Sequence, residues 1–154
     1  MIDAPQIIQS AGQLAAVIHL TIPREEIRSV MGPGISELMT AVAAQGIATA
    51  GPWFSHHLRI DPGIFDFEIG VPVAAPVAGT GRVQPGQLPA ATVARTIYRG
   101  DYEGLGAAWS ELMEWIAAAG YRHGQELWEC YLVGPEANLD PAGWRTELNR
   151  PVIL

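Results

Sequence analysis

Apolar residues recur at helical spacing in two separate stretches of the chain. Residues 36–39 read Ser-Glu-Leu-Met, and residues 110–113, 74 positions later, read the same. Each stretch ends at a glycine, Gly46 in the first and Gly120 in the second, and glycine commonly ends a helix. The apolar stripe of the second stretch consists of Leu105, Trp109, Leu112 and Ile116. The pattern predicts two amphipathic helices at matched positions, and a Gly-Pro-Gly sequence at residues 32–34 can break the first.

Alternating or aromatic-rich stretches flank each predicted helix. One strand is expected before each helix and two after it, because these stretches have the two-residue period and the composition of strands. The last strand of each set has the pattern Glu-x-x-x-Pro-Val, at residues 68–73 and at residues 147–152. The other predicted strands occupy residues 15–21, 52–60, 94–100 and 127–133.

The order strand, helix, strand, strand therefore occurs twice. We interpret it as a duplication within a single domain, with repeats at about residues 5–73 and 90–153 and a Gly- and Pro-rich linker at about 74–89. Two convergently similar amphipathic helices are the alternative. Because such a half cannot bury its sheet alone, we expect an α+β fold with antiparallel sheets, two main helices and pseudo-twofold symmetry. Ligand sites occur preferentially at such junctions, so we also expect a ligand cleft between the repeats.

Strand alternation assigns side chains to the two faces of each sheet. Cys130 is typical of a core, so its face is expected to meet the helix. Glu129 and Tyr131 then face the predicted cleft, and by the repeat Trp53 and His57 face it too. A carboxylate among apolar neighbours must take a proton, find a partner or meet a cation. Glu129 is therefore either a ligand-binding group, or a solvent-exposed edge residue, or the partner of an arginine such as Arg145 or Arg150.

Composition narrows the function classes further. The chain has 154 residues and a net charge of −7, and all nine of its basic residues are arginines. It lacks the clustered basic residues of a nucleic-acid binder, so we expect no direct nucleic-acid binding. No apolar run is long enough for a membrane span and the N-terminus does not resemble a signal peptide, so no membrane association is expected. The single cysteine, Cys130, fits a reducing cytoplasm.

The residues do not predict a metal or a cofactor. His56 and His57 are adjacent on a predicted strand, so they point to opposite faces and cannot chelate one metal ion. The glycines form neither a phosphate-binding loop nor a dinucleotide fingerprint. We therefore expect a site that uses side chains alone.

Four stretches together resemble the GyrI-like small-molecule-binding family, which also occurs as the effector domain of multidrug-sensing transcription activators. They lie at residues 66–73, 98–105, 128–132 and 146–152. The resemblance covers essentially the whole chain. It implies a duplicated strand-helix-strand-strand fold with a ligand groove between the repeats, and an acidic residue amid aromatic side chains in that groove.

The resemblance also suggests a site. Glu129, in the sequence Glu-x-Tyr, matches the family's acidic residue, whereas His57 stands where the family often has tyrosine. The predicted ligand-binding residues are Trp53, His57, Tyr102, Glu129, Tyr131 and Trp144. The rings of Trp53, Tyr102 and Trp144 would form stacking walls, although each could instead belong to a core. The implied function is that of a stand-alone protein that binds and sequesters planar lipophilic, often cationic, small molecules such as xenobiotics.

Two alternatives follow from other members of the family. One subfamily hydrolyses the cyclopropane of yatakemycin-type DNA alkylators in an aromatic cage, and here Glu129 and Tyr131 would be the catalytic residues. Because they are two positions apart on one strand, their backbones should be roughly 6.5–7 Å apart, with room for a substrate atom or water between the tips. Other members resemble gyrase inhibitors, which implies a protein partner.

Overall fold

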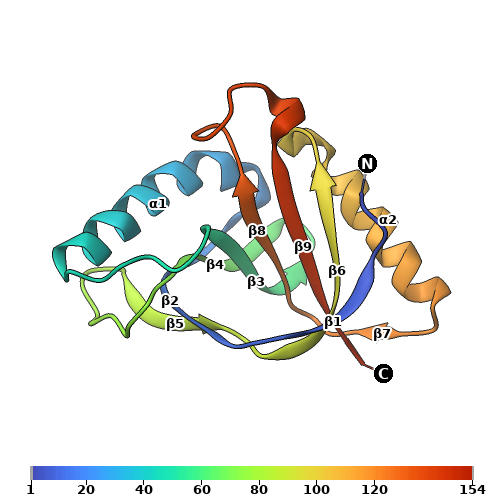
Figure 1. Cartoon of the computed structure of the whole chain (residues 1–154), viewed down its shortest axis with the longest axis horizontal. Coiled ribbons are helices and arrows are strands. Elements are labelled where there is room, and N and C mark those ends of the chain that lie inside the picture. Colours follow the sequence, from blue (N-terminus) through green and yellow to red (C-terminus); the bar gives the residue numbers. More distant parts are fainter. Residues whose placement is uncertain (1, 154) are drawn as a thin grey trace. The chain divides into compact units, whose positions relative to one another are not determined.

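The computed structural model describes residues 2–153. The chain forms two compact units, one of residues 11–90 and one of the remaining residues from both ends of the chain. We call them the middle unit and the terminal unit. Each combines one main helix with antiparallel strands, so the α+β class with two main helices is confirmed (Figure 1).

The middle unit begins with β2 (Gln13–Pro23), a 3-10 turn η1 (Arg24–Glu26) and α1 (Ile27–Ala44). It continues with β3 (Phe54–Asp61), β4 (Ile64–Pro72) and β5 (Gln84–Leu88). Its strands lie in the order β3-β4-β2-β5, and every pair is antiparallel. β5 lies within the segment for which the sequence predicts a linker.

The helix of the middle unit packs on β2 and β4. Leu38 and Val42 from α1 are buried against Ile18, Phe67 and Ile69 from the strands. In β4, Phe67 and Ile69 alternate with Asp66 and Glu68, so the face of β4 that meets α1 is apolar.

The predicted break in the first helix is wrong, because α1 continues through Pro33. Gly34 explains how packing offsets the poor helix propensity of this segment. A Cβ at Gly34 would lie 2.6 Å from Cδ1 of Ile69, so a larger residue there would force the Ile69 side chain to shift, and glycine lets the helix lie this close to β4. The burial that this approach permits stabilises a helix that the sequence alone disfavours.

The terminal unit begins with β1 (Gln6–Ser10) and resumes with β6 (Ala91–Arg99), a 3-10 turn η2 (Tyr102–Gly104) and α2 (Leu105–Ala118). It ends with β7 (Arg122–His123), β8 (Leu127–Val133), a 3-10 turn η3 (Pro141–Gly143) and β9 (Arg145–Ile153). Its main strands lie in the order β1-β6-β9-β8, all antiparallel, and β7 pairs with β9. Leu112 and Ile116 from α2 are buried against Ala94 and Leu148 from the strands.

The two units share details beyond the order of their main elements. β3 pairs with β4 with a register shift between His57 and Arg59, and β8 pairs with β9 with a register shift between Tyr131 and Val133. Both irregularities fall at positions 74 residues apart, the same offset that separates the two Ser-Glu-Leu-Met segments. Such bulges redirect side chains and often lie beside functional sites.

No helix within residues 2–153 combines the length and the apolar character that crossing a membrane would require.

Candidate functional site

Glu129 and Tyr131 lie on the face of the terminal unit's sheet that α2 covers. Glu129 is directly opposite Leu148, and Leu148 belongs to the core beneath α2. The prediction that Cys130 faces the helix is therefore wrong. Cys130 lies opposite Glu147 on the other face, where burial raises the pKa of its thiol to about 12 and leaves it unreactive at neutral pH.

The Glu129 carboxylate accepts hydrogen bonds from two aromatic side chains. The indole Nε1 of Trp109 donates to Oε2 over 2.6 Å, and the hydroxyl of Tyr131 donates to Oε1 over 2.8 Å. The predicted gap between the tips of Glu129 and Tyr131 is therefore not present. Instead, the two side chains form a single polar group that is set among aromatic rings.

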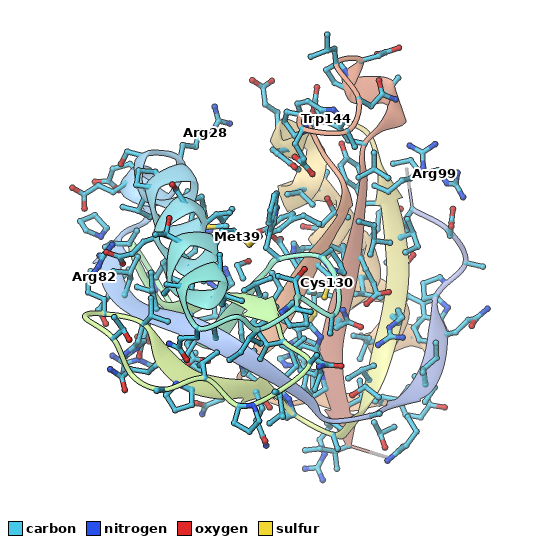
Figure 2. The ribbon with its side chains drawn as sticks, turned by 60° about the vertical axis from the view of Figure 1, so that its left-hand side comes forward. Arg28, Met39, Arg82, Arg99, Cys130 and Trp144 are labelled. Atoms are coloured by element: carbon cyan, nitrogen blue, oxygen red, sulfur yellow. The ribbon has the colours of Figure 1, made fainter. Side chains whose placement is uncertain are left out.

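Two further rings extend this group. Tyr131 meets Tyr102 edge to face, with 5.8 Å between the ring centroids, and Tyr102 meets Trp144 at 4.9 Å with the planes tilted by 34°. Figure 2 shows Trp144 beside the loop that joins β8 to β9, and its indole Nε1 donates to the carbonyl of Asn138 in that loop over 2.8 Å. A continuous series of contacts thus joins Trp109, Glu129, Tyr131, Tyr102 and Trp144, which we call the aromatic-acid cluster.

The environment of Tyr102 keeps its hydroxyl protonated. Burial raises the pKa of Tyr102, and the nearby carboxylates of Glu136 and Glu129 raise it further. A protonated phenol can donate a hydrogen bond to a bound molecule. Gly134 leaves space for the Tyr102 hydroxyl, because a Cβ at position 134 would lie 2.8 Å from its oxygen.

The two remaining predicted ligand residues belong to the middle unit. Trp53 is half-buried and immediately precedes β3. His57 is 6% exposed, stacks on Phe67 with 5.1 Å between centroids and meets Phe65 edge to face. Because His57 lies opposite Phe67 in the sheet, it shares the face covered by α1, which again reverses the predicted face.

His57 is a neutral, buried imidazole. Burial lowers its pKa to about 4, and the charges of His56 and Arg24 act in the same direction. The guanidinium of Arg24 lies over the ring of Phe65, 4.9 Å from its centroid. The Nδ1 atom of His57 has no hydrogen-bond partner among the described residues.

Stability should therefore fall with acidification between pH 6.5 and about 4. In this range the unfolded chain binds a proton at His57 and the folded chain does not, so acid favours unfolding by up to about 2–3 kcal/mol. His57→Phe should flatten this part of the profile, because phenylalanine keeps the ring packing and cannot be protonated. Urea unfolding at half-unit pH steps measures it. A variant profile as steep as that of the unmodified protein would contradict the assignment.

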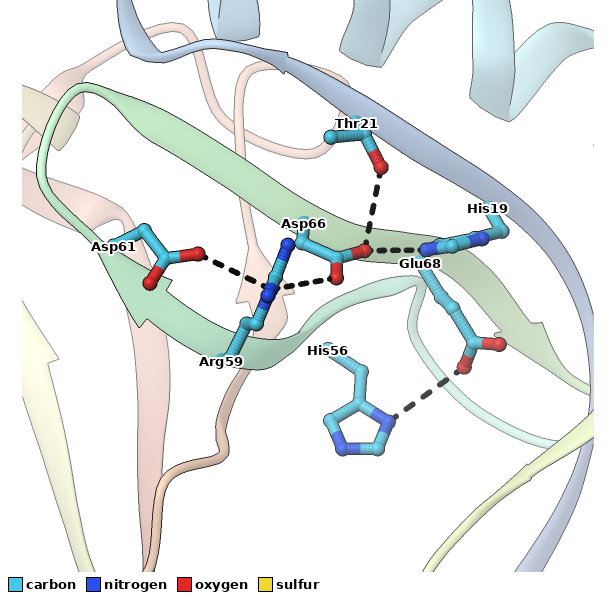
Figure 3. A network of polar contacts seen from close by, with 7 residues as sticks. All are labelled: His19, Thr21, His56, Arg59, Asp61, Asp66 and Glu68. Atoms are coloured by element: carbon cyan, nitrogen blue, oxygen red, sulfur yellow. Dashed lines mark hydrogen bonds and ion pairs between the residues drawn. The ribbon is translucent and has the colours of Figure 1, made fainter.

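A hydrogen-bond network centred on Asp66 connects strands of the middle unit on the face away from α1. Asp66 accepts hydrogen bonds from His19 on β2 and from Arg59 on β3, and Thr21 on β2 also donates to it (Figure 3). The hydrogen bond from His19 is the main cause that lowers the pKa of Asp66. Among residues 2–153, no group of three histidine, cysteine or acidic side chains has the geometry to hold a metal ion. The hydrogen bonds to Asp66 join three strands, β2, β3 and β4.

Trp109 is the cluster residue that sequence reasoning missed. Its place in the apolar stripe of α2 predicts a core side chain, and its ring does pack against that core. A half-buried indole also needs an acceptor for its N–H group, and a carboxylate among apolar neighbours needs donors. Those two needs were the available signal, but the wrong face assignment separated Trp109 from Glu129.

Several solved structures superpose on this chain over nearly its whole length. The chain superposes on the crystal structure of the EcmrR C-terminal domain with a TM-score of 0.86 and 22% identity, over 97% of each chain. It spans 57% of the longer EcmrR chain in a DNA complex. SAV2435 bound to tetraphenylphosphonium gives a TM-score of 0.73 at 15% identity, over 98% of this chain and 94% of that one. A hydrolase from Listeria innocua gives a TM-score of 0.67 at 12% identity, over 97% of this chain and 91% of the hydrolase chain.

These likenesses show a common fold. No curated protein sequence matches the chain significantly. The sequence model of the GyrI-like small molecule binding domain, however, matches residues 3–152, which include both helices and the whole aromatic-acid cluster. The chain therefore belongs to the GyrI-like small-molecule-binding family.

Proposed function

We propose that this protein binds planar lipophilic small molecules, with cations favoured, and sequesters them. The observation that carries the proposal is the Glu129 carboxylate, which two aromatic side chains hold within a series of four rings. Aromatic faces attract lipophilic cations, with about 0.5–2 kcal/mol for each good contact, and a carboxylate adds its charge. The proposed ligand contacts are Tyr102, Glu129, Tyr131 and Trp144, with Trp53 and His57 from the middle unit.

Two features of the sequence interpretation remain part of the proposal: the duplication and a ligand groove between the repeats. The duplication is supported by the shared order of elements and by the register shifts at His57 and Tyr131. It is also supported by Leu38 and Leu112, which occupy the same place in the two Ser-Glu-Leu-Met segments and are both fully buried. The fold shared with tetraphenylphosphonium-bound SAV2435 supports a lipophilic cation as the first ligand to test.

The test is a titration with two ligands of similar shape and different charge. Tetraphenylphosphonium is a cation, and triphenylphosphine oxide presents three of the same rings without net charge. Quenching of tryptophan fluorescence should be saturable for tetraphenylphosphonium, with an affinity at least about tenfold above that for the oxide. Equal affinities would remove the preference for cations. Because neither probe is planar, a rhodamine dye tests planar ligands separately, and failure of all three compounds to saturate would contradict the proposal.

Hydrolysis of a strained ring is the second candidate, supported by the fold that the chain shares with the Listeria innocua hydrolase. In that reaction the oxygen of water would bond to a cyclopropane carbon while a ring carbon–carbon bond breaks. The electron pair would move to the dienone oxygen, which would take up a proton and become a phenol. Glu129 would accept the proton of the attacking water, and a tyrosine hydroxyl would donate to the developing phenolate.

Mass spectrometry of a cyclopropane-bearing alkylator after incubation with the protein distinguishes the two candidates. A water adduct that forms faster than in buffer would support hydrolysis. Single-turnover rates of the variants then show whether Glu129 and Tyr131 take part in the reaction. If Glu129→Gln and Tyr131→Phe weaken binding but leave the rate for bound substrate unchanged, these residues serve binding alone.

A further inference from the structure

Both oxygens of Glu129 accept hydrogen bonds, and the two donors come from different elements. Trp109 is on α2 and donates to Oε2, whereas Tyr131 is on β8, two residues from Glu129, and donates to Oε1. The Trp109 ring packs against the buried core beneath α2. The donor to Oε2 is therefore fixed by the packing of the helix and not by the strand that carries Glu129.

Two donors constrain a carboxylate more than one does. A glutamate side chain has three rotatable bonds. If Tyr131 were the only donor, the carboxylate could still rotate about the hydrogen bond between the Tyr131 hydroxyl and Oε1. A second donor on the other oxygen fixes the carboxylate plane. Both donors are neutral, so these two hydrogen bonds orient the charge without cancelling it. A charge already in place binds a cation more tightly, because less freedom is lost on binding.

We propose that Trp109 is a positioning residue that fixes Glu129 for recognition of a cationic ligand. The proposal rests on the proposed function, since it assigns Trp109 a part in the charge recognition for which Glu129 is responsible. The ring of Trp109 packs in the core while its N–H group acts on the carboxylate. Loss of the N–H group should therefore affect cationic ligands and leave neutral ones unchanged.

The variant that separates these roles is Trp109→Phe, which keeps an aromatic ring and removes the donor. We expect the affinity for tetraphenylphosphonium to fall about three- to tenfold, and the affinity for triphenylphosphine oxide to stay the same. Trp115→Phe is the matched control, since Trp115 is also half-buried on α2 and also packs against the core. It should change neither affinity.

A spectroscopic measurement tests the same contact without relying on the variant's stability. In a proton–nitrogen NMR spectrum, the indole N–H resonance missing from Trp109→Phe belongs to Trp109. That resonance should move in Glu129→Gln and on addition of tetraphenylphosphonium, while the Trp115 resonance should move less in both cases. A Trp109 resonance that does not move in Glu129→Gln would overturn the hydrogen bond and the proposal with it.

The remaining outcomes separate this proposal from the proposed function. If Glu129→Gln weakens cation binding and Trp109→Phe does not, Glu129 keeps its role and the positioning role of Trp109 is wrong. If Trp109→Phe lowers the affinity for both ligands equally, Trp109 contributes only packing, and this result also overturns the proposal. If Glu129→Gln leaves cation binding unchanged, charge recognition itself fails, and the positioning role fails for that separate reason.

Discussion

Replacing Glu129 by glutamine should weaken tetraphenylphosphonium binding about ten- to hundredfold and leave triphenylphosphine oxide binding unchanged. Glutamine has the size and shape of glutamate, and its side-chain oxygen can still accept a hydrogen bond from Trp109 or Tyr131. What it lacks is the negative charge. A loss of about 1.4–2.8 kcal/mol corresponds to this range, and it is reasonable for two charges a few ångströms apart near a protein surface. Isothermal titration calorimetry with both ligands measures the effect.

The control for this prediction is Glu111→Gln. Glu111 is exposed on α2 and outside the aromatic-acid cluster, so the substitution changes the net charge of the protein by the same amount. It should leave cation binding nearly unchanged, and the small remaining effect should disappear as salt is added. If the two variants weaken cation binding equally, the preference for cations arises from the overall charge of −7 and not from the cluster.

The elements that sequence could predict are those with a strong periodic signal. The helices carry apolar stripes, and Leu38 and Leu112 in the repeated tetrapeptide are indeed fully buried. β5 gave no such signal. Its sequence, Gln-Pro-Gly-Gln-Leu, has a low strand propensity, and it forms a strand because its backbone pairs with β2. A tertiary contact of this kind cannot be found from local composition.

Sequence could predict that Glu129 and Tyr131 lie close together, but not which face of the sheet they occupy. Glu129 and Tyr131 were paired correctly on one face, since they are two positions apart. The face itself was wrong because Trp128 and Cys130, which point the other way, are also buried, at 2% and 9% exposed. When both faces of a strand are covered, alternation of apolar and polar residues no longer tells which face meets the helix. The same ambiguity concealed the contact of Trp109 with Glu129.

Leu112→Ala should lower the free energy of unfolding by about 2–5 kcal/mol. Leu112 is fully buried where α2 packs on the terminal unit's sheet, in contact with a core that includes Ala94, Ile116 and Leu148. Truncation removes apolar contacts and leaves a cavity that a close-packed core only partly refills. Leu38→Ala, at the matched position in α1, should cost a similar amount, because Leu38 is also fully buried. Urea unfolding followed by circular dichroism measures both.

Met39→Ala provides the control within the same tetrapeptide. Met39 follows Leu38 but is 36% exposed, so its truncation should cost clearly less than the loss of either leucine. The comparison tests the helical phase in α1 directly, since a shift of one residue would bury Met39 and expose Leu38. A cost for Met39→Ala equal to that for Leu38→Ala would contradict the packing of α1. A cost below about 1 kcal/mol for Leu112→Ala would contradict the core beneath α2, and with it the support that holds Trp109 against Glu129.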